Sequence, residues 1–476
     1  MARVPYHWRA LSVVTLGSLV TGINAGTLNV ALPVVVRHFD AGALAAHWVL
    51  LSFMLTNTVL LVLCGRLADE FGRRETYLLG YGVFTLSSLL LGLAPTIEAV
   101  IALRVVQAAG FAMILANATA IIAHAFPPHL LSQGIGLYIS TISVAQVLGP
   151  SVGGLLAEAA GWRWVFWFNV PFGVAAICWG AFTLRRLPRG EREPVDVRGA
   201  LLLLVWLGGL LLALSEAGSL GWDSPLVLAG LAALAAGLPA FWWAQRRTGH
   251  PLLDLEMFRD AGFALANLAA LCHTLARFGI VLVAALFFQA VWRADAATAG
   301  LAVLPVPIAM MVASPLAGAL ARLLGPRPVA VAGPAMTAAG LATLLVTLDR
   351  DTPYPLVAAG LALMGAGSGV FLTGNTTAIM ARVPRDRLGV VNGMRLTLQN
   401  VGNTLGVALS LSMIASVLPA GDRPALFNGT VPAGSLTEVL AGYDRAIAAM
   451  LVMALASMAA AVAGLVVTRR DPPPAR

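Results

Sequence analysis

Lysine is absent from the sequence, and charged residues of both signs are scarce. Of the 476 residues, 59% are hydrophobic and 11% are charged, whereas soluble domains are about half apolar and about a quarter charged. Because a soluble surface needs more charge than this, the composition favours a protein that lies in a lipid bilayer. A nucleotide-binding loop of the GxxxxGK(S/T) type needs a lysine, so the absence of lysine excludes ATP-driven pumping by this chain.

Cysteine is also scarce, and Cys64, Cys178 and Cys272 each lie in an apolar run. No two of them are spaced like metal ligands, and an odd number in apolar surroundings argues against a disulfide framework. The histidines do not cluster like metal ligands either. We therefore expect no metal site, no cofactor, no catalytic residues and no enzymatic activity. The net charge of +8 would suggest nucleic acid only in a soluble chain, so no nucleic-acid partner is expected.

Apolar runs long enough to cross a bilayer recur along the whole sequence. A transmembrane helix needs about 20 mainly apolar residues, and fourteen such runs lie between charged or Pro/Gly-rich breaks. The expected spans are roughly 10–32, 44–65, 76–95, 97–124, 133–157, 163–184, 199–216, 225–244, 262–291, 298–321, 327–348, 355–381, 389–418 and 442–468.

The arginines indicate how these spans are oriented. If both termini are cytoplasmic, 21 arginines lie in cytoplasmic segments, 6 lie in external segments and 3 lie within spans, namely Arg104, Arg277 and Arg395. This asymmetry agrees with the positive-inside rule. We expect a multi-pass protein of the cell (inner) membrane with both termini in the cytoplasm and an external loop at 419–441.

The sequence repeats itself at a constant spacing of 253 residues. Gly65 and Gly72 recur as Gly318 and Gly325. At the same spacing, Gly136, Gln146, Gly149 and Gly153 recur as Gly389, Gln399, Gly402 and Gly406. Repeated helical bundles of this kind are typical of secondary transporters. The predicted domains are a six-helix half over 1–184, a cytoplasmic linker and two extra spans over 185–258, and a second six-helix half over 259–476.

The loop between the second and third expected spans reads GRLADEFGRR over residues 65–74. Glycines permit a tight turn and a close approach of helices, and an aspartate can bind both a helix N-terminus and arginines. We expect this cytoplasmic loop to act as a conformational latch. The residues predicted to form the latch are Gly65, Asp69, Gly72, Arg73 and Arg74.

The same loop resembles the signature loop of the major facilitator superfamily. Three further segments, at 104–110 (RVVQAAG), 148–154 (LGPSVGG) and 162–171 (WRWVFWFNVP), resemble its fourteen-span drug:proton antiporter branch, the EmrB/QacA type. The resemblance covers essentially the whole chain. It implies an all-α membrane protein with the major facilitator fold, built from two six-helix halves plus two inserted helices, 14 transmembrane helices in total. It also implies a proton-coupling role for Arg104 and an antiporter motif at Gly149, Pro150, Gly153 and Gly154.

The first span departs from this branch at Asn24, where the branch typically has an aspartate. An asparagine cannot carry a proton or a negative charge. The ionisable residues expected near mid-membrane are instead Arg104, His273, Arg277 and Arg395. His273 and Arg277 are four residues apart and so share one helix face. His273 is a candidate for proton coupling, and a packing role for it remains the alternative.

The central path is therefore expected to be neutral to positive, which favours neutral, zwitterionic or anionic cargo over lipophilic cations. The residues expected to line the substrate path are Asn24, Asn57, Gln146, Arg277, Gln289, Asn375, Arg395 and Gln399. Two alternatives stay open for this set. The amides could join helices by hydrogen bonds, and the arginines could bind backbone carbonyls or extend to the membrane interface.

Together these features predict a proton-coupled exporter of a small amphiphilic drug or natural product that works by alternating access as a monomer. Its expected partners are the small-molecule substrate, protons and the lipid bilayer. Two other functions remain open. One is a translocator of lipid-like molecules on the same fold. The other is a membrane receptor without turnover, against which the short hydrophilic linker at 185–198 argues, because a receptor usually has a soluble effector domain.

Overall fold

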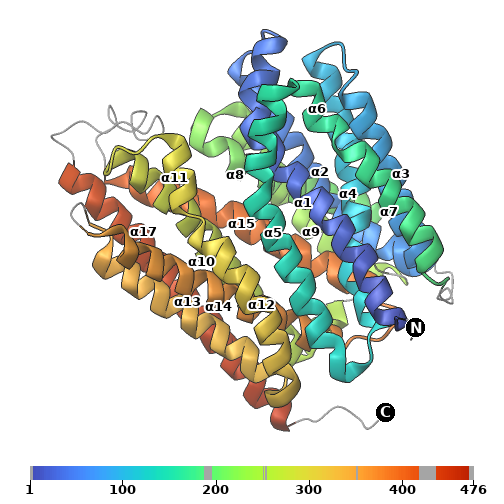
Figure 1. Cartoon of the computed structure of the whole chain (residues 1–476). Helices are drawn as coiled ribbons and strands as arrows, with labels where there is room; N and C mark the ends of the chain where they lie inside the picture. Colours follow the sequence, from blue (N-terminus) through green and yellow to red (C-terminus); the bar gives the residue numbers. More distant parts are fainter. Residues whose placement is uncertain are drawn as a thin grey trace. The chain divides into compact units, whose positions relative to one another are not determined.

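The computed structural model describes residues 4–186, 196–249, 251, 255–349, 352–417 and 436–470, and in these ranges every regular element is a helix (Figure 1). The first nine α-helices are α1 (Tyr6–His38), α2 (Ala43–Phe71), α3 (Arg73–Leu91), α4 (Ile97–Ala125), α5 (Leu131–Ala159), α6 (Trp162–Trp167), α7 (Asn169–Thr183), α8 (Val197–Leu220) and α9 (Pro225–Arg247). The others are α10 (Ala261–Ala290), α11 (Ala296–Ala302), α12 (Pro305–Leu324), α13 (Pro326–Thr347), α14 (Tyr354–Met380), α15 (Leu388–Ser416) and α17 (Leu436–Arg470). Two short 3₁₀ turns lie at Pro128–Leu130 and Leu255–Arg259.

Helices lie at each of the fourteen positions expected from the apolar runs, but the expected count of fourteen spans is not confirmed. In the described ranges, twelve spans are long and apolar enough to cross a membrane. The two helices at expected spans that do not qualify are α3 and α15. Helix α3 begins with Arg73, Arg74 and Glu75, and α15 carries six polar or charged side chains from Asn392 to Asn403. Local polarity, rather than helix length, separates these two from the rest.

Local signals explain where several helices begin and end. The Asp260 carboxylate accepts hydrogen bonds from the backbone N–H groups of Gly262 and Phe263 (2.7 and 3.3 Å) at the start of α10. Asp295 caps the short helix α11 through the N–H of Thr298 at 2.6 Å, and this bond lowers the pKa of the Asp295 carboxyl. N-caps of this kind satisfy donors that the first turn of a helix leaves without partners.

Residue contacts divide the chain into two compact units. The first contains Met1–Ala213, Asp223–Asp254 and Met380–Thr397, and the second contains Leu214–Trp222, Leu255–Ile379 and Leu398–Arg476. The boundaries expected at 184 and 259 are not tested by this division and stay a prediction. Most of the expected linker 185–198 and of the expected external loop 419–441 lies outside the described residues.

In the first unit, α1 packs along α5, and α4 packs against both α2 and α3 (Figure 1). Tyr77, Tyr81, Phe84 and Phe166 are among its largest fully buried side chains. The apolar interior is therefore closed by large aromatic rings on α3 and α6.

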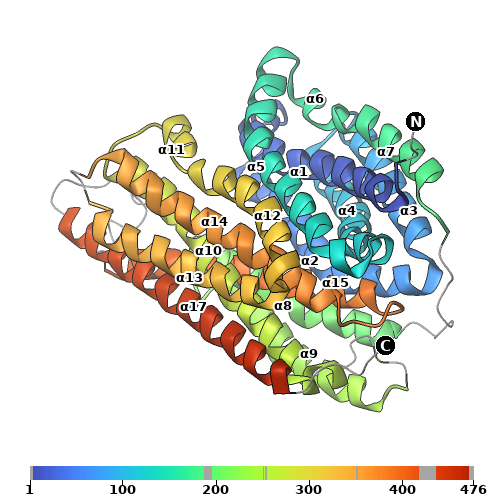
Figure 2. The ribbon, with the colours of Figure 1, turned by 60° about the horizontal axis from the view of Figure 1, so that its bottom comes forward.

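In the second unit, α17 packs against α10 and α13, and Figure 2 shows these helices running side by side. Phe287 contacts Phe288 and Tyr443, with ring centroids 6.1 and 5.4 Å apart. These rings belong to an apolar core that also includes residues of α13 and α14.

Candidate functional site

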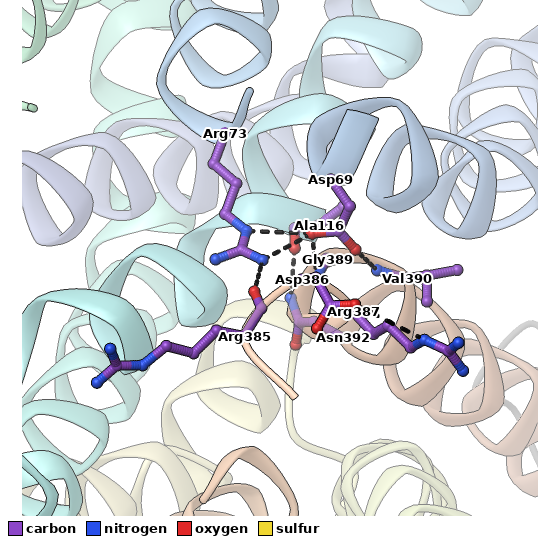
Figure 3. Close-up of polar contacts among 9 residues, drawn as sticks. All are labelled: Asp69, Arg73, Ala116, Arg385, Asp386, Arg387, Gly389, Val390 and Asn392. Carbon is purple, nitrogen blue, oxygen red and sulfur yellow. Dashed lines mark hydrogen bonds and ion pairs between the residues drawn. The ribbon is translucent and has the colours of Figure 1, made fainter. Parts of the chain in front are cut away.

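Asp69, in the last turn of α2, lies against the first turn of α15 (Figure 3). Its carboxylate accepts hydrogen bonds from the backbone N–H groups of Gly389 (3.0 Å) and Val390 (2.9 Å), the second and third residues of α15. The first N–H groups of a helix have no partner within the helix, and the helix dipole favours a negative charge there. Asp69 thus caps a helix 320 residues away in the sequence.

Arg73 holds this carboxylate from the other side (Figure 3). Its guanidinium donates to Asp69 Oδ1 through Nη2 (2.8 Å) and Nε (3.1 Å), and it also donates to the carbonyl oxygen of Arg385. The side chains of Arg73 and Asp69 are 7% and 8% exposed. Because buried charges need such partners, the pair and the helix end depend on one another. We call Asp69, Arg73, Arg385, Gly389 and Val390 the Asp69 cluster.

Glycines let α2 and α15 approach closely beside this cluster. A Cβ atom on Gly389 would lie 2.5 Å from the carbonyl oxygen of Gly65 and 2.8 Å from the Asp69 carboxylate. A Cβ atom on Gly393, one turn further, would lie 2.4 Å from the carbonyl oxygen of Leu61. These positions therefore tolerate no larger residue unless the helices move apart.

Further hydrogen bonds fix the start of α15. The amide of Asn392 donates to the carbonyl oxygens of Leu115 (3.1 Å) and Ala116 (2.8 Å) on α4. The hydroxyl of Thr397 donates to the carbonyl oxygen of Thr58 on α2 at 3.2 Å. The first turns of α15 are thus bound to both α2 and α4.

Of the five predicted latch residues, Gly65, Asp69, Gly72 and Arg73 meet in one place, whereas Arg74 does not contact Asp69. Gly72 ends α2 with a φ of 108°, a conformation that favours glycine. Arg74 instead donates to the carbonyl oxygen of Ala181 on α7 at 2.7 Å and lies 3.6 Å from Glu75. Arg74 therefore joins α3 to α7.

Arg104 is 3% exposed and is surrounded by neutral acceptors. It donates to the carbonyl oxygen of Val49 (3.3 Å) and to the side-chain oxygen of Gln107 (2.5 Å), and its guanidinium lies 3.9 Å from the ring centre of Phe53. Gln107 in turn donates to Ser88 at 2.8 Å. This network joins α2, α3 and α4 without a carboxylate among the described residues.

The glycines of the predicted antiporter motif lie on α5, and two of them face α1. A Cβ atom on Gly149 would lie 2.9 Å from the Cα atom of Gly26, and one on Gly153 would lie 2.6 Å from the Cα atom of Thr27. Pro150 lies inside α5 and has no N–H group to donate to the preceding turn. Gly154 differs, because a Cβ atom there would meet only Val30, at 3.8 Å.

In the second unit, the two ionisable residues of α10 have different surroundings. His273 is fully buried, with Nε2 3.2 Å from the hydroxyl of Ser368 and its ring 4.3 Å from that of Phe371. Arg277 is partly buried and contacts the sulfur of Met310 (3.8 Å) and the ring of Phe278 (4.1 Å). His273 is thus engaged at Nε2, and Arg277 is the more accessible of the two groups. The coupling role of His273 and the packing alternative both stay predictions.

The other residues expected in the substrate path differ in their surroundings within their own units. Arg395 is 4% exposed and donates to the side chain of Asn392 at 2.9 Å, while Asn375 joins α14 to the Ala266 carbonyl of α10 at 3.2 Å. Gln289 donates within its own helix, to the Ala285 carbonyl, and Gln146 is exposed.

The path amides that keep unbonded atoms are Asn24, Asn57 and Gln399. Asn24 is 1% exposed, and among the described residues neither its amide nitrogen nor its amide oxygen has a hydrogen-bond partner. The side-chain oxygen of Asn57 and the side-chain nitrogen of Gln399 are likewise buried without one in that part of the chain. These atoms retain capacity to bind a polar group.

The sequence indicated that Asp69 can bind a helix N-terminus, but it did not identify the helix, which is α15 at Gly389 and Val390. Gly389 had nevertheless been marked by the internal repeat, and a glycine repeated at a fixed spacing signals a close backbone contact.

The twelve spans of the described ranges that are long and apolar enough to cross a membrane indicate a multi-pass membrane protein. The chain belongs to the Major Facilitator Superfamily, whose model matches residues 14–206 and 266–476. The family indicates a non-enzymatic transport protein. No group of three or more potential metal ligands occurs among the described residues.

Named relatives show which members of the superfamily the chain is similar to. It is 34% identical over 413 residues to the multidrug resistance protein Stp of Mycobacterium tuberculosis, covering 86% of this chain and 76% of that protein. It is 29% identical over 411 residues to the tetracenomycin C resistance and export protein of Streptomyces glaucescens, with the same coverage of 86% and 76%. Among solved structures, the proton:xylose symporter XylE has a TM-score of 0.66 at 15% identity, covering 94% of each chain, which shows the fold alone.

Proposed function

We propose that this protein exports a small amphiphilic compound, a drug or natural product, across the cell membrane by alternating access driven by protons. The names of its relatives, a multidrug resistance protein and a resistance and export protein, are the observation that carries the direction of transport. We also propose a monomer with cytoplasmic termini, for which the arginine asymmetry is the support.

The proposal includes fourteen transmembrane helices, as in the drug:proton antiporter branch. Its support is that α3 and α15, which have 19 and 29 residues, are long enough to span about 30 Å of hydrocarbon at 1.5 Å per residue. The polar residues of α15 face protein in the described structure: Asn392 and Arg395 are buried, at 0% and 4% exposure. Buried polar groups in a span are compatible with a membrane position.

The Asp69 cluster is proposed as the latch that stabilises one of the alternating states. Its support is the mutual dependence of one carboxylate, one arginine and one helix end, which can separate as a unit. Arg104 is proposed as the coupling residue. Among the described residues its guanidinium is held by neutral oxygens and the ring of Phe53, so it responds to a nearby change in charge.

The function is tested by transport with the purified protein in proteoliposomes that contain a pH-sensitive dye. A panel of candidate drugs is supplied with and without an imposed proton gradient. We expect substrate movement together with proton movement in the opposite direction, and no movement with the matched variant Asp69→Arg. A wild-type protein that moves no compound of the panel, in vesicles shown to be tight, would contradict export.

Asn24→Asp tests why the first span departs from the branch. Because a carboxylate would pair with a positive charge in the low-dielectric path, this variant is expected to gain recognition of lipophilic cations such as ethidium. Asn117→Asp, at a buried amide of the first unit outside the expected path, is the control for adding a carboxylate. Efficient ethidium efflux by the wild type that Asn24→Asp does not increase would contradict this explanation.

The orientation is tested by cysteine labelling in a variant that lacks the three natural cysteines. A cysteine introduced at Ser435 should react with an impermeant maleimide on intact cells, whereas one at Glu191 should react only after permeabilisation. Both positions lie outside the described residues, so the sequence alone motivates the choice. The opposite labelling pattern would overturn the proposed topology.

A further inference from the structure

The three arginines within spans differ in how their guanidinium groups are satisfied. Arg104 donates to the Val49 carbonyl and to the Gln107 side chain and is 3% exposed. Arg395 donates to the Asn392 side chain and is 4% exposed. Both side chains are therefore held inside the protein by oxygen acceptors of the chain itself.

Arg277 has no such acceptor among the residues that the structure describes. Its contacts there are the thioether of Met310, 3.8 Å from Nη1, and the ring of Phe278, 4.1 Å from the guanidinium carbon. A guanidinium has five N–H donors, and sulfur is a weak acceptor. A cation at this depth is costly unless an anion or water satisfies it.

The neighbouring ionisable group does not fill this role. His273 lies one helical turn before Arg277, but its Nε2 atom interacts with Ser368 and its ring stacks on Phe371. His273 is also fully buried, whereas Arg277 is only partly buried. Arg277 is therefore the more accessible of these two groups, and the contacts of its guanidinium among the described residues are a thioether and an aromatic ring.

We propose that Arg277 binds a carboxylate group of the cargo, which makes the exported compound an amphiphilic organic anion. The inference rests on the proposed export function and narrows its substrate class. The planar guanidinium matches a carboxylate with two parallel hydrogen bonds. Phe278 and Met310 beside it provide apolar surface for the rest of the molecule. Arg395, which the sequence also suggested as an anchor, is already bonded within the first unit.

The test is a binding measurement on the purified protein with three fluorescent probes of one scaffold. The probes are pyrenebutyrate, its methyl ester and the corresponding trimethylammonium cation. We expect the carboxylate to bind wild type about 10- to 100-fold more tightly than the ester, as for a charge-assisted bidentate pair. Arg277→Gln should remove this preference while the ester's affinity stays within about two-fold.

Two further variants separate charge from geometry. Arg277→Lys keeps the positive charge but loses the paired N–H donors of the guanidinium. It should therefore retain part of the carboxylate preference that Arg277→Gln loses. Arg293→Gln removes an exposed arginine beyond the end of α10 and should leave all three affinities unchanged. If Arg277→Gln does not fold, the test is the ratio of carboxylate to ester affinity in wild type and in Arg277→Lys. A ratio that is lower in Arg277→Lys than in wild type supports the assignment, and equal ratios contradict it.

Equal binding of carboxylate and ester by wild type, or a carboxylate affinity that Arg277→Gln leaves unchanged, would overturn the assignment. Failure of the proposed function is distinguishable from this result. Selective carboxylate binding without any transport would contradict export and support the anion site. Transport of neutral or cationic drugs without carboxylate preference would support export and contradict the anion site.

Discussion

The loop at 65–74 and its repeat at 318–327 have the same backbone but different charges. Gly72 and Gly325 end α2 and α12 with φ of 108° and 87°, and each N–H bonds the carbonyl four residues earlier, in Ala68 and Ala321. At the position of Asp69, however, the second loop has Arg322, and at that of Arg73 it has Pro326.

The two loops share a glycine turn but differ in whether they carry a carboxylate. The glycine turn is needed in both halves to stop one helix and start the next. The carboxylate that binds a helix N-terminus occurs in the first loop only, because an arginine at position 322 cannot accept hydrogen bonds. The proposed latch therefore belongs to the first loop alone, and the following changes test this difference between the two loops.

The largest effect is expected from Asp69→Arg, which copies the second loop into the first. It leaves the N–H groups of Gly389 and Val390 unsatisfied and sets two cations side by side. Since losing one partner of a buried pair costs about 3–5 kcal/mol, transport per folded protein should fall about a hundredfold or more. The reciprocal control, Arg322→Asp at the exposed position of the second loop, should change transport less than about two-fold. Equal losses in both variants would show that the two loops are equivalent.

A smaller loss is expected from Asp69→Asn, which keeps the shape and one hydrogen-bond acceptor but removes the charge. Hydrogen bonds to charged groups contribute about 1.5–3 kcal/mol, so transport in proteoliposomes should fall about tenfold. Size-exclusion chromatography controls for folding. Unchanged rates in a monodisperse variant would show that charge is irrelevant to the latch.

The glycine crossings, unlike the loops, are expected to behave alike in the two units. A Cβ atom on Gly153 would lie 2.6 Å from the Thr27 carbonyl oxygen, and one on its repeat partner Gly406 would lie 2.6 Å from that of Leu275. Gly153→Ala and Gly406→Ala should each destabilise by about 1–3 kcal/mol, measured as a lower thermal midpoint. Gly154→Ala is the matched control, with open space around it. A midpoint lowered in only one of the two crossings would break the proposed equivalence.

The smallest effect is expected at Arg74, which bonds α7 rather than Asp69. Arg73→Gln should reduce transport about tenfold by freeing the carboxylate, whereas Arg74→Gln should reduce it less than about threefold. Transport rates of the two variants, normalised to folded protein, decide this. A larger loss from Arg74→Gln would place Arg74 in the latch.

The sequence predicted the positions of the helices well because hydrocarbon demands a long apolar run for each span. It did not predict the break at Phe168, between α6 and α7. The apolar run over 163–184 continues through this position, so hydropathy indicates one uninterrupted helix. The break between α11 and α12 does carry a local signal, since Pro305 begins α12.

The candidate site was predictable in part. Asp69 and Arg73 stand out from one loop, but their partner Gly389 lies in another part of the chain and is reached only through tertiary packing. For residues such as Asn375 and Arg395, the sequence could not decide between lining the substrate path and joining helices. Both roles place a polar side chain within a span. Only their hydrogen bonds distinguish them.

The glycine contact between α2 and α15 has a consequence for how fast it can open. Gly65, Gly389 and Gly393 have no side-chain torsions, so closing the contact orders no rotamers, whereas burying a long side chain loses about 1.5–2 kcal/mol of rotamer entropy. The contact can separate and close again without side chains having to search for their positions. The hydrogen bonds between α2 and α15 come from the Asp69 carboxylate and the Thr397 hydroxyl, whose partners water can replace. A surface of this kind suits the proposed latch, which has to form again in every transport cycle.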